Sequence, residues 1–320
     1  MTALQNAKVV VTGGCGFIGS HLIERLTRCR ARVLAIDSLE YGRRENLDLS
    51  DPHIQIEKLE LRSGTSEQLR KLLNGVDYIF HLAAEKHNQS INSPGRVLEA
   101  NVMGTYELLR AAVDAGVKKV VFTSSLYAYG RMNAPPMSED ETPAPHTVYG
   151  ISKLSGELLC HYFYMQAGIP VVCLRLFFVY GSRQYAGLGY KSVIVKNFDR
   201  MIKGHKPMIH GDGSQELDYI YVDDVVSALL LAMTGDDTFG VFNIGSGSAV
   251  SINQLTKLMM EVAGVETECE YGPADFTAGS SRVANTLKFD RHFGRQTRVP
   301  LSEGLQRTFE WMASSRREST

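Results

Sequence analysis

The sequence is poor in cysteine, in net charge and in long apolar runs. Its five cysteines are an odd number without C-x-x-C spacing, so we expect reduced thiols in a cytoplasmic protein rather than a disulfide framework. No group of cysteines and histidines has the spacing of metal ligands, and we expect no metal site. A net charge of −1 gives no general attraction to nucleic acid or to an anionic membrane, so neither is expected as a partner.

The longest apolar stretch, Ile169–Tyr180, is interrupted by Arg175 and is too short to span a bilayer. The N-terminal residues lack the charged and then apolar regions of a secretion signal. What remains is an ordinary globular composition, with 44% hydrophobic and 22% charged residues. A chain of 320 residues can form one large domain or two small ones.

A glycine-rich turn follows the first apolar run. Residues 8–22 read KVVVTGGCGFIGSHL, a pattern typical of a buried strand, a turn and the start of a helix. Gly13, Gly16 and Gly19 are spaced three residues apart, which is wider at the first step than the G-x-G-x-x-G fingerprint. Such glycines permit a tight turn, let a pyrophosphate approach the backbone and let the helix pack closely. An ordinary strand–helix connection would also explain them.

An acidic residue at the end of the next strand strengthens the interpretation of the glycines as a dinucleotide-binding turn. Residues 32–36 read RVLAI, a second short strand, and Asp37 closes it. A carboxylate there accepts hydrogen bonds from an adenosine ribose and repels a 2′-phosphate, so we expect NAD rather than NADP. Arg43 and Arg44 could instead hold a phosphate, although two arginines in a polar loop are usually only solvated.

Strands and helices alternate over the first 180 residues. Further strands are predicted at 54–61, 76–84, 119–123 and 171–178, and helices at 66–74, 96–115 and 149–166. This alternation predicts an α/β fold with a Rossmann-type doubly wound parallel sheet. We expect residues 1–180 to form the NAD-binding domain, interleaved with later segments. Residues 181–313 should mainly form a smaller mixed α/β lid that binds substrate, and residues 314–320 a polar tail.

Tyr149 and Lys153 stand four residues apart at the start of a predicted helix, which places both side chains on one face. An ammonium beside a phenol favours the phenolate, so we expect the pKa of Tyr149 to fall below its usual value of about 10. Tyr149 would then be a general base near neutral pH. The spacing also occurs often by chance, but Thr123, Ser124 and Ser125 place hydroxyls at the same edge of the sheet.

Further stretches support this interpretation: TGGCGFIGSH, FHLAA at 80–84, Asn101 with Gly104-Thr105, FTSSLYAYG, YGISK, LRLFFVYGSRQ, HGDGSQELDYIYVDDV and EGLQRTFEW. With Asp37, they resemble the extended short-chain dehydrogenase/reductase family, and within it the nucleotide-sugar epimerases and dehydratases of the UDP-glucose 4-epimerase kind. The resemblance runs from Val9 to about Trp311, almost the whole chain.

The resemblance implies roles for individual residues. Tyr149 would be the catalytic base, Lys153 would lower its pKa and hold the nicotinamide ribose, and Ser125 would be the catalytic hydroxyl. A nucleotide-diphosphate sugar would occupy the cleft, and the helices at 96–115 and 149–166 would join two subunits in a homodimer. NAD would be bound by Gly13, Gly16, Phe17, Ile18, Gly19, Asp37, Leu61, Leu82, Ala83, Ala84, Lys86, Asn101, Thr123, Tyr149 and Lys153.

Departures from the family pattern narrow the reaction. In the dehydratases an Asp-Glu pair follows the catalytic hydroxyl and supplies the acid and base for water loss, whereas this chain has Leu126 and Tyr127. The leading interpretation is therefore a 4-epimerase that oxidises, turns and reduces its sugar. One alternative is a 4-keto reductase, or a dehydratase that recruits Tyr127, Glu85 or His87. Another is a non-catalytic NAD sensor. A sensor would not need Ser125, Tyr149 and Lys153 together, and all three are present.

Other departures concern substrate binding. Phe178 replaces an asparagine that commonly contacts the substrate in the family, and Leu217 replaces an arginine that commonly touches the diphosphate. Arg183, Lys191 or Arg282 could replace that arginine at the diphosphate, although each is equally well explained as a surface charge. The expected substrate-binding residues are Ser124, Ser125, Phe178, Arg183, Lys191 and Arg282.

Overall fold

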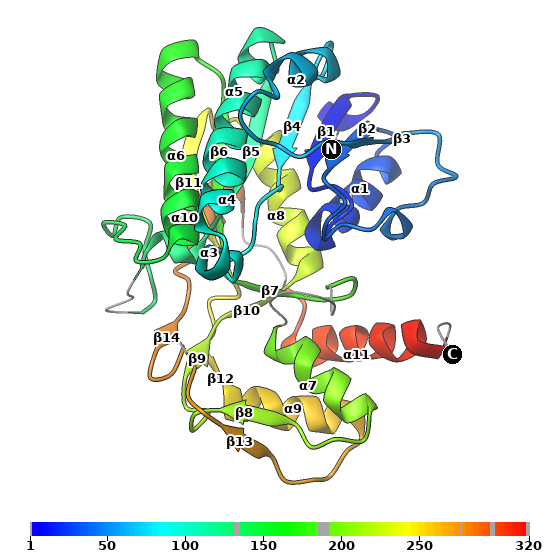
Figure 1. The fold of residues 1–320 in the computed structure, drawn as a ribbon, viewed down its shortest axis with the longest axis vertical. Helices are drawn as coiled ribbons and strands as arrows, with labels where there is room; N and C mark the ends of the chain where they lie inside the picture. The colour runs from blue at the N-terminus through cyan, green and yellow to red at the C-terminus, as the bar shows by residue number, and fades with distance from the viewer. Residues whose placement is uncertain (1, 131–134, 185–191, 276, 295–297, 318–320) are drawn as a thin grey trace.

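A seven-stranded parallel sheet is the centre of the molecule (Figure 1). This computed structural model describes residues 2–130, 135–184, 192–275, 277–294 and 298–317. The strands follow the order β11-β6-β5-β4-β1-β2-β3, and each pairs in parallel with its neighbours. They are β1 (Lys8–Thr12), β2 (Arg32–Asp37), β3 (Ile54–Lys58), β4 (Tyr78–His81), β5 (Lys119–Ser125), β6 (Val171–Leu176) and β11 (Phe239–Ile244). The predicted doubly wound α/β fold is confirmed.

Helices cover both faces of the sheet and bury an apolar core on each. One face carries α1 (Phe17–Arg28) and α8 (Val222–Thr234), and the other carries α2 (Ser66–Leu72), α5 (Gly104–Asp114) and α6 (Val148–Ala167). Every residue of β5 and β6 is buried, as expected of strands covered on both faces. Although α8 and β11 follow Tyr180 in the chain, they belong to this sheet layer.

The prediction of one helix at 96–115 is wrong in one respect, because a π-helical turn interrupts it. α4 (Pro94–Leu98) is followed without a gap by the π turn η3 (Glu99–Met103) and then by α5. A π turn adds one residue without breaking the helix, so no helix start or stop signal marks it in the sequence. The turn carries Asn101 into the interior of the protein.

Three predicted strands end earlier than expected. The third and fourth strands end at Lys58 and His81, and the following residues form loops at the carboxyl edge. The sixth strand ends at Leu176, and the chain then enters β7 (Phe178–Tyr180), which pairs with β10 (Tyr219–Tyr221) outside the main sheet. The apolar sequence runs through both β6 and β7, so it does not reveal this change of partner.

A smaller layer, which we call the lid, lies beyond the carboxyl edge of the sheet and below it in Figure 1. In the lid β8 (Met208–His210) pairs with β13 (Glu270–Gly272), and β9 (Glu216–Leu217) lies between β12 (Val250–Ser251) and β14 (Ser281–Arg282). Its apolar core is enclosed by α7 (Val193–Ile202), α9 (Ile252–Ala263) and α11 (Leu301–Arg317). The remaining short helices are η1 (Thr2–Leu4), η2 (Arg44–Asn46), α3 (Gln89–Asn92), η4 (Leu126–Ala128) and α10 (Leu287–Phe293).

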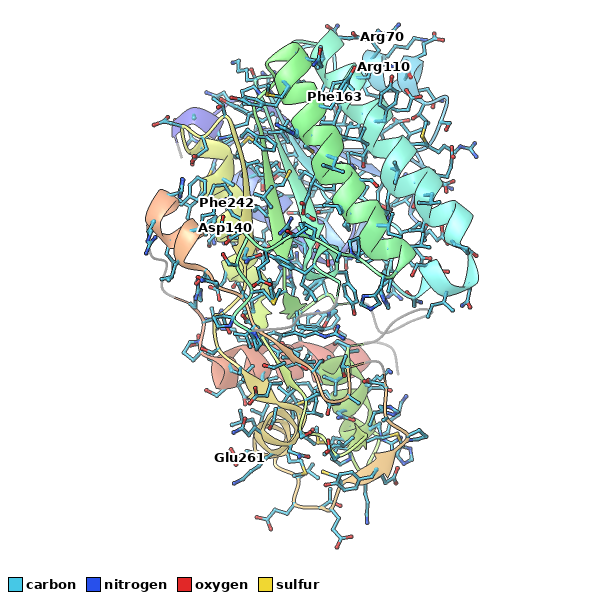
Figure 2. All side chains as sticks on the ribbon, turned by 90° about the vertical axis from the view of Figure 1, so that its left-hand side faces the viewer. Arg70, Arg110, Asp140, Phe163, Phe242 and Glu261 are labelled. Atoms are coloured by element: carbon cyan, nitrogen blue, oxygen red, sulfur yellow. The ribbon has the colours of Figure 1, made fainter. Side chains whose placement is uncertain are left out.

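The helices α5 and α6 lie side by side along one side of the sheet layer (Figure 2). Tyr106 of α5 packs against Phe163 of α6, with ring centres 5.8 Å apart. Within the described ranges, no helix is both long enough and apolar enough to cross a membrane.

Candidate active site

A cavity of about 850 Å³ lies between the carboxyl edge of the sheet and the lid. Its wall runs from the turn after β1, past the ends of β4 and β5, to α7, β8 and β9. The strand order reverses between β1 and β4, so the cavity lies at the switch point where doubly wound sheets bind ligands.

The turn after β1 brings the backbone to the cavity at two glycines. Gly13 has a φ of 69°, a left-handed conformation that suits glycine, and its N–H donates to the carbonyl of Ile36. A Cβ at Gly19 would lie 2.2 Å from the carbonyl oxygen of Gly13, so no side chain fits there. Because α1 begins at Phe17, its first N–H groups lie at this turn and suit a phosphate.

Asp37 closes β2 with its carboxylate at the cavity wall. The carboxylate accepts hydrogen bonds from the backbone N–H groups of Cys15 (3.0 Å) and Leu39 (2.8 Å), which fix its position. Burial raises the pKa of Asp37, and these two hydrogen bonds oppose the rise. Arg43 and Arg44 are absent from the described wall of the cavity, whereas Asp37 is part of it. Asp37 is therefore better placed than either arginine to meet a ribose.

These features fit NAD: a glycine cradle that a Cβ would fill, a helix N-terminus for the pyrophosphate and a carboxylate for the ribose. Asn101 is the one expected cofactor residue that is absent from the described wall. Its side chain bonds the backbone N–H and carbonyl of Glu85 and the hydroxyl of Ser152, so it positions the loop before Lys86. The other expected cofactor residues line the cavity: Gly13, Gly16, Phe17, Ile18, Gly19, Asp37, Leu61, Leu82, Ala83, Ala84, Lys86, Thr123, Tyr149 and Lys153.

Three side chains with catalytic potential meet at the end of β5 and the first turns of α6. The side chains of Ser125 and Tyr149 are hydrogen-bonded to each other. The ammonium of Lys153 donates to the carbonyl of Thr123 (2.8 Å) and lies 5.8 Å from the centre of the Tyr149 ring. All of these residues line the cavity, so a hydroxyl, a phenol and a cation face one ligand space.

The pKa of Tyr149 differs from the value expected from the sequence. Burial raises the pKa of Tyr149 to about 12, and the hydrogen bond with Ser125 only partly opposes it. Burial also lowers the pKa of Lys153 to about 8, against the raising effect of the Glu157 carboxylate. The expected fall in the Tyr149 pKa is therefore wrong for the protein alone, because burial dominates and the Lys153 ammonium is not among the groups that shift this pKa.

A buried ion pair, which the sequence analysis did not predict, lies next to these residues. Arg175 donates to both carboxylate oxygens of Glu157, through Nε at 2.9 Å and Nη2 at 2.7 Å. Ser124, which was expected to bind substrate, lines the cavity, and its hydroxyl donates to the same Glu157 carboxylate at 2.5 Å. The cluster ties β5, β6 and α6 together. Two signals could have revealed it: Arg175 within an apolar strand, and Glu157 one helical turn after Lys153.

The two expected substrate cations that the structure describes lie in different elements, Arg183 after β7 and Arg282 in β14. Arg183 is absent from the described cavity wall and pairs with Glu24 of α1 at 2.8 Å, so it gives the diphosphate prediction no support. Arg282 lies in β14, in register with Leu217 of β9. Leu217 lines the cavity, whereas Arg282, like Arg183, is absent from the described wall. Lys191 lies outside the described residues.

The wall of the cavity that faces the sheet edge has an apolar part and a basic part. Phe178 lines the cavity, and its ring centre lies 5.8 Å from that of Tyr219. Ser192 accepts the N–H of Val195 as the N-cap of α7, and Ser192 and Lys196 both line the cavity. The N-terminus of α7 therefore adds a basic, anion-compatible segment that the sequence analysis did not identify.

Comparison with known proteins establishes the family. Residues 9–245 match the model described as the NAD dependent epimerase/dehydratase family. The chain belongs to this family. The UDP-glucose 4-epimerase of Mycolicibacterium smegmatis is 33% identical, over 95% of this chain and 98% of its own. The predicted family resemblance is confirmed, and the cofactor is NAD.

Two solved structures show the same fold. UDP-glucose 4-epimerase from Thermotoga maritima with UDP-glucose has a TM-score of 0.90 and 35% identity, covering 96% of this chain and 99% of that one. MoeE5 in complex with UDP-glucuronic acid and NAD has a TM-score of 0.86 and 34% identity, covering 97% and 100%. A dTDP-glucose 4,6-dehydratase from Streptomyces griseus also matches, at 30% identity over 95% of this chain and 93% of its own. The family thus joins epimerases and dehydratases.

Proposed function

We propose that the protein is an NAD-dependent nucleotide-sugar 4-epimerase that works through a transient 4-keto sugar. The observation that carries the proposal is the pair Leu126 and Tyr127 directly after Ser125, where elimination of water would need two carboxylates. The nearby carboxylate of Glu85 pairs with Arg96 at 2.9 Å and so is held away from that role. The epimerase names among its relatives also support the proposal.

The chain's own residues supply the proton transfers. Tyr149 takes the proton from the 4-hydroxyl of the sugar and returns it after the sugar has turned, while Ser125 shares and orients that proton. Lys153, with a pKa of about 8, is mostly an ammonium at neutral pH and stabilises the phenolate. When bound, NAD would accept a hydride from C4 and return it to the opposite face, and its positively charged ring would also favour the phenolate.

The remaining groups hold the ligands in place. The glycine turn and the N-terminus of α1 would bind the pyrophosphate of NAD, and Asp37 its adenosine ribose. The first turn of α7, with Lys196, suits the diphosphate of the substrate. Phe178 offers the sugar an apolar surface without a hydrogen bond, which leaves a keto sugar room to turn while its diphosphate stays anchored.

We also propose that the protein is a cytoplasmic homodimer. Apolar side chains of α6 are exposed at intervals that share one helix face: Ile151, Leu158, Tyr162 and Met165. Leu98 and Met103, on the neighbouring segment before α5, are also exposed. Such a continuous apolar strip suits a subunit interface.

A dehydratase is the second candidate. Tyr127 and His87 lie beside Tyr149, with ring centres 5.7 Å and 5.9 Å from its ring, so other proton carriers are present. Turnover of UDP-, dTDP-, GDP- and CDP-sugars by the NAD-loaded protein tests both candidates. We expect at least one sugar to be converted to its 4-epimer. Tight NAD binding without turnover of any sugar would instead indicate a sensor.

A further inference from the structure

Two loops flank the glycine turn that would hold the pyrophosphate of NAD. In the sheet β1 lies between β2 and β4, so the loops that follow β2 and β4 stand on either side of the turn after β1. The first loop passes close to Asp37, because a Cβ at Gly42 would lie 2.7 Å from its carboxylate oxygens. Residues of both loops line the cavity, together with Gly13 and Gly16 of the turn. The groove for the cofactor therefore runs between the two loops.

One tyrosine joins these two loops. Tyr41, in the loop after β2, donates its hydroxyl to the carboxylate of Glu85 (3.3 Å) and accepts the side-chain amide of Gln89 (2.7 Å), both in the segment after β4. The ammonium of Lys86 lies 4.3 Å from the centre of the Tyr41 ring. We call Tyr41, Glu85 and Gln89 the strap. Burial and the nearby carboxylates raise the pKa of Tyr41 to about 12, so at neutral pH the hydroxyl keeps the proton that it donates.

An arginine adds a second connection between the loops. Arg96 of α4 pairs with Glu85 at 2.9 Å and also with Glu40 of the loop after β2. The side chain of Arg96 is 42% exposed, and ion pairs of such exposure contribute little and weaken with salt. The hydrogen bonds at Tyr41 reach the buried carboxylate of Glu85, so they hold the two loops together more firmly than the ion pairs do.

We propose that the strap is a gate for the cofactor: it closes the groove over NAD and must open before NAD can enter or leave. Its hydrogen bonds join protein groups to one another, so they favour the closed groove both with and without NAD. The strap therefore slows entry and release alike and has little effect on the equilibrium constant. The gate depends on the NAD site alone, whichever sugar reaction the protein catalyses.

The exchange of NAD measures the gate directly. Protein loaded with isotope-labelled NAD is mixed with excess unlabelled NAD, and the loss of label gives the release rate. Calorimetry on the same protein stripped of cofactor gives Kd. Tyr41→Phe removes both hydrogen bonds of the strap and keeps the ring beside Lys86, so we expect its release rate to rise at least about fivefold, the scale for two lost hydrogen bonds. Kd should change by less than about twofold, so that the entry rate rises with the release rate.

Gln89 separates a gate from a direct ligand of NAD. It is absent from the described wall of the cavity, so a change there removes no wall contact with the cofactor. Gln89→Leu breaks one bond of the strap and should raise the release rate about twofold or more, and it should add nothing in Tyr41→Phe, which already lacks that bond. Tyr164→Phe is the matched control, because it removes a tyrosine hydroxyl that bonds Thr238, and it should leave the release rate unchanged.

Two other results would overturn the gate. A release rate of Tyr41→Phe equal to that of wild type would show that the strap does not limit exchange. Faster release with a matching rise in Kd and an unchanged entry rate would make the Tyr41 hydroxyl an ordinary ligand of NAD. Thermal melting checks that each variant is folded, and if Tyr41→Phe is not, the same two rates of Gln89→Leu decide.

Discussion

Tyr149 is buried enough that the protein alone keeps it a phenol, with its pKa raised to about 12. A phenol with such a pKa is almost entirely protonated at neutral pH, so its use as a base depends on positive charge that favours the phenolate. Lys153 supplies one such charge, held at 2.8 Å from the carbonyl of Thr123. In the proposed mechanism, the positively charged ring of bound NAD would add a second charge that favours the phenolate.

Replacing Tyr149 with phenylalanine removes the proton carrier and keeps the ring. We expect turnover to fall by on the order of a hundredfold or more, the usual scale for a general base, with NAD binding and melting temperature nearly unchanged. Steady-state kinetics, calorimetry and thermal melting measure the three quantities. Near-normal turnover in a well-folded variant would remove Tyr149 from the mechanism.

Glu157 acts on Lys153 from one helical turn away and raises its pKa. Glu157→Gln should therefore lower the pKa of Lys153, so that the ammonium is lost at lower pH and the alkaline limb of kcat/KM moves to lower pH. The change also leaves Arg175 buried without its carboxylate, at a cost of about 3–5 kcal/mol of stability. The pH profile is recorded below the melting temperature of the variant.

A matched control separates the charge effect from lost stability. Glu107 is another buried carboxylate, paired with Arg110 on α5, and is not among the groups that shift the pKa of Lys153. Glu107→Gln should leave the alkaline limb in place, whereas the double variant Glu157→Gln/Arg175→Met should regain stability and keep the shifted limb. Equal pH profiles for Glu157→Gln and wild type would show that the cluster is only structural.

At the scale of single helices and strands, the predicted boundaries are most accurate where one residue type determines the local structure. Thr147 caps α6 by accepting the N–H of Gly150, and Gly168, at φ 68°, ends it, so the boundaries of this helix are close to those predicted. The π turn around Asn101 and the exit of the chain into β7 follow from tertiary contacts, which leave no local signal. The pair of Glu157 with Arg175 did leave a signal, an arginine within an apolar strand, but the sequence alone does not show which carboxylate it meets.

The turn between β1 and α1 gives a test at this scale. Gly19→Ala would force a Cβ against the carbonyl of Gly13, so we expect a loss of about 1–3 kcal/mol of stability and at least tenfold weaker NAD binding. Gly95→Ala in α4 is the control, because a Cβ there meets nothing within 4 Å. Melting curves and calorimetry compare them, and equal effects of the two changes would contradict the tight-turn account.

At the scale of the whole molecule, the proposed dimer depends on the exposed strip of α6. Leu158 is 61% exposed in the single chain, so Leu158→Glu should leave the fold intact and shift the protein from dimer to monomer. Leu49→Glu changes a residue of equal exposure, 62%, in the loop between β2 and β3 and should remain dimeric. Sedimentation at micromolar concentration measures both, and a monomeric wild type would refute the proposal.

In the proposed reaction, the two layers of the molecule would have different parts. The sheet layer holds the glycine turn, Asp37 and the catalytic group in fixed positions at one edge. The lid supplies the N-terminus of α7, and β7 between the two layers adds the apolar surface around Phe178. An arrangement that anchors a diphosphate and leaves the sugar loosely held suits a reaction in which the sugar turns over before it is reduced.

The mass and configuration of the product test this account most directly. The NAD-loaded protein is incubated with the nucleotide sugar that it turns over, and the product is analysed by mass spectrometry and NMR spectroscopy. We predict a product of unchanged mass with inverted configuration at C4 and no net accumulation of NADH, because the hydride returns to the sugar. A product lighter by one water would contradict the account and direct attention to Tyr127, Glu85 and His87 as the groups that eliminate it.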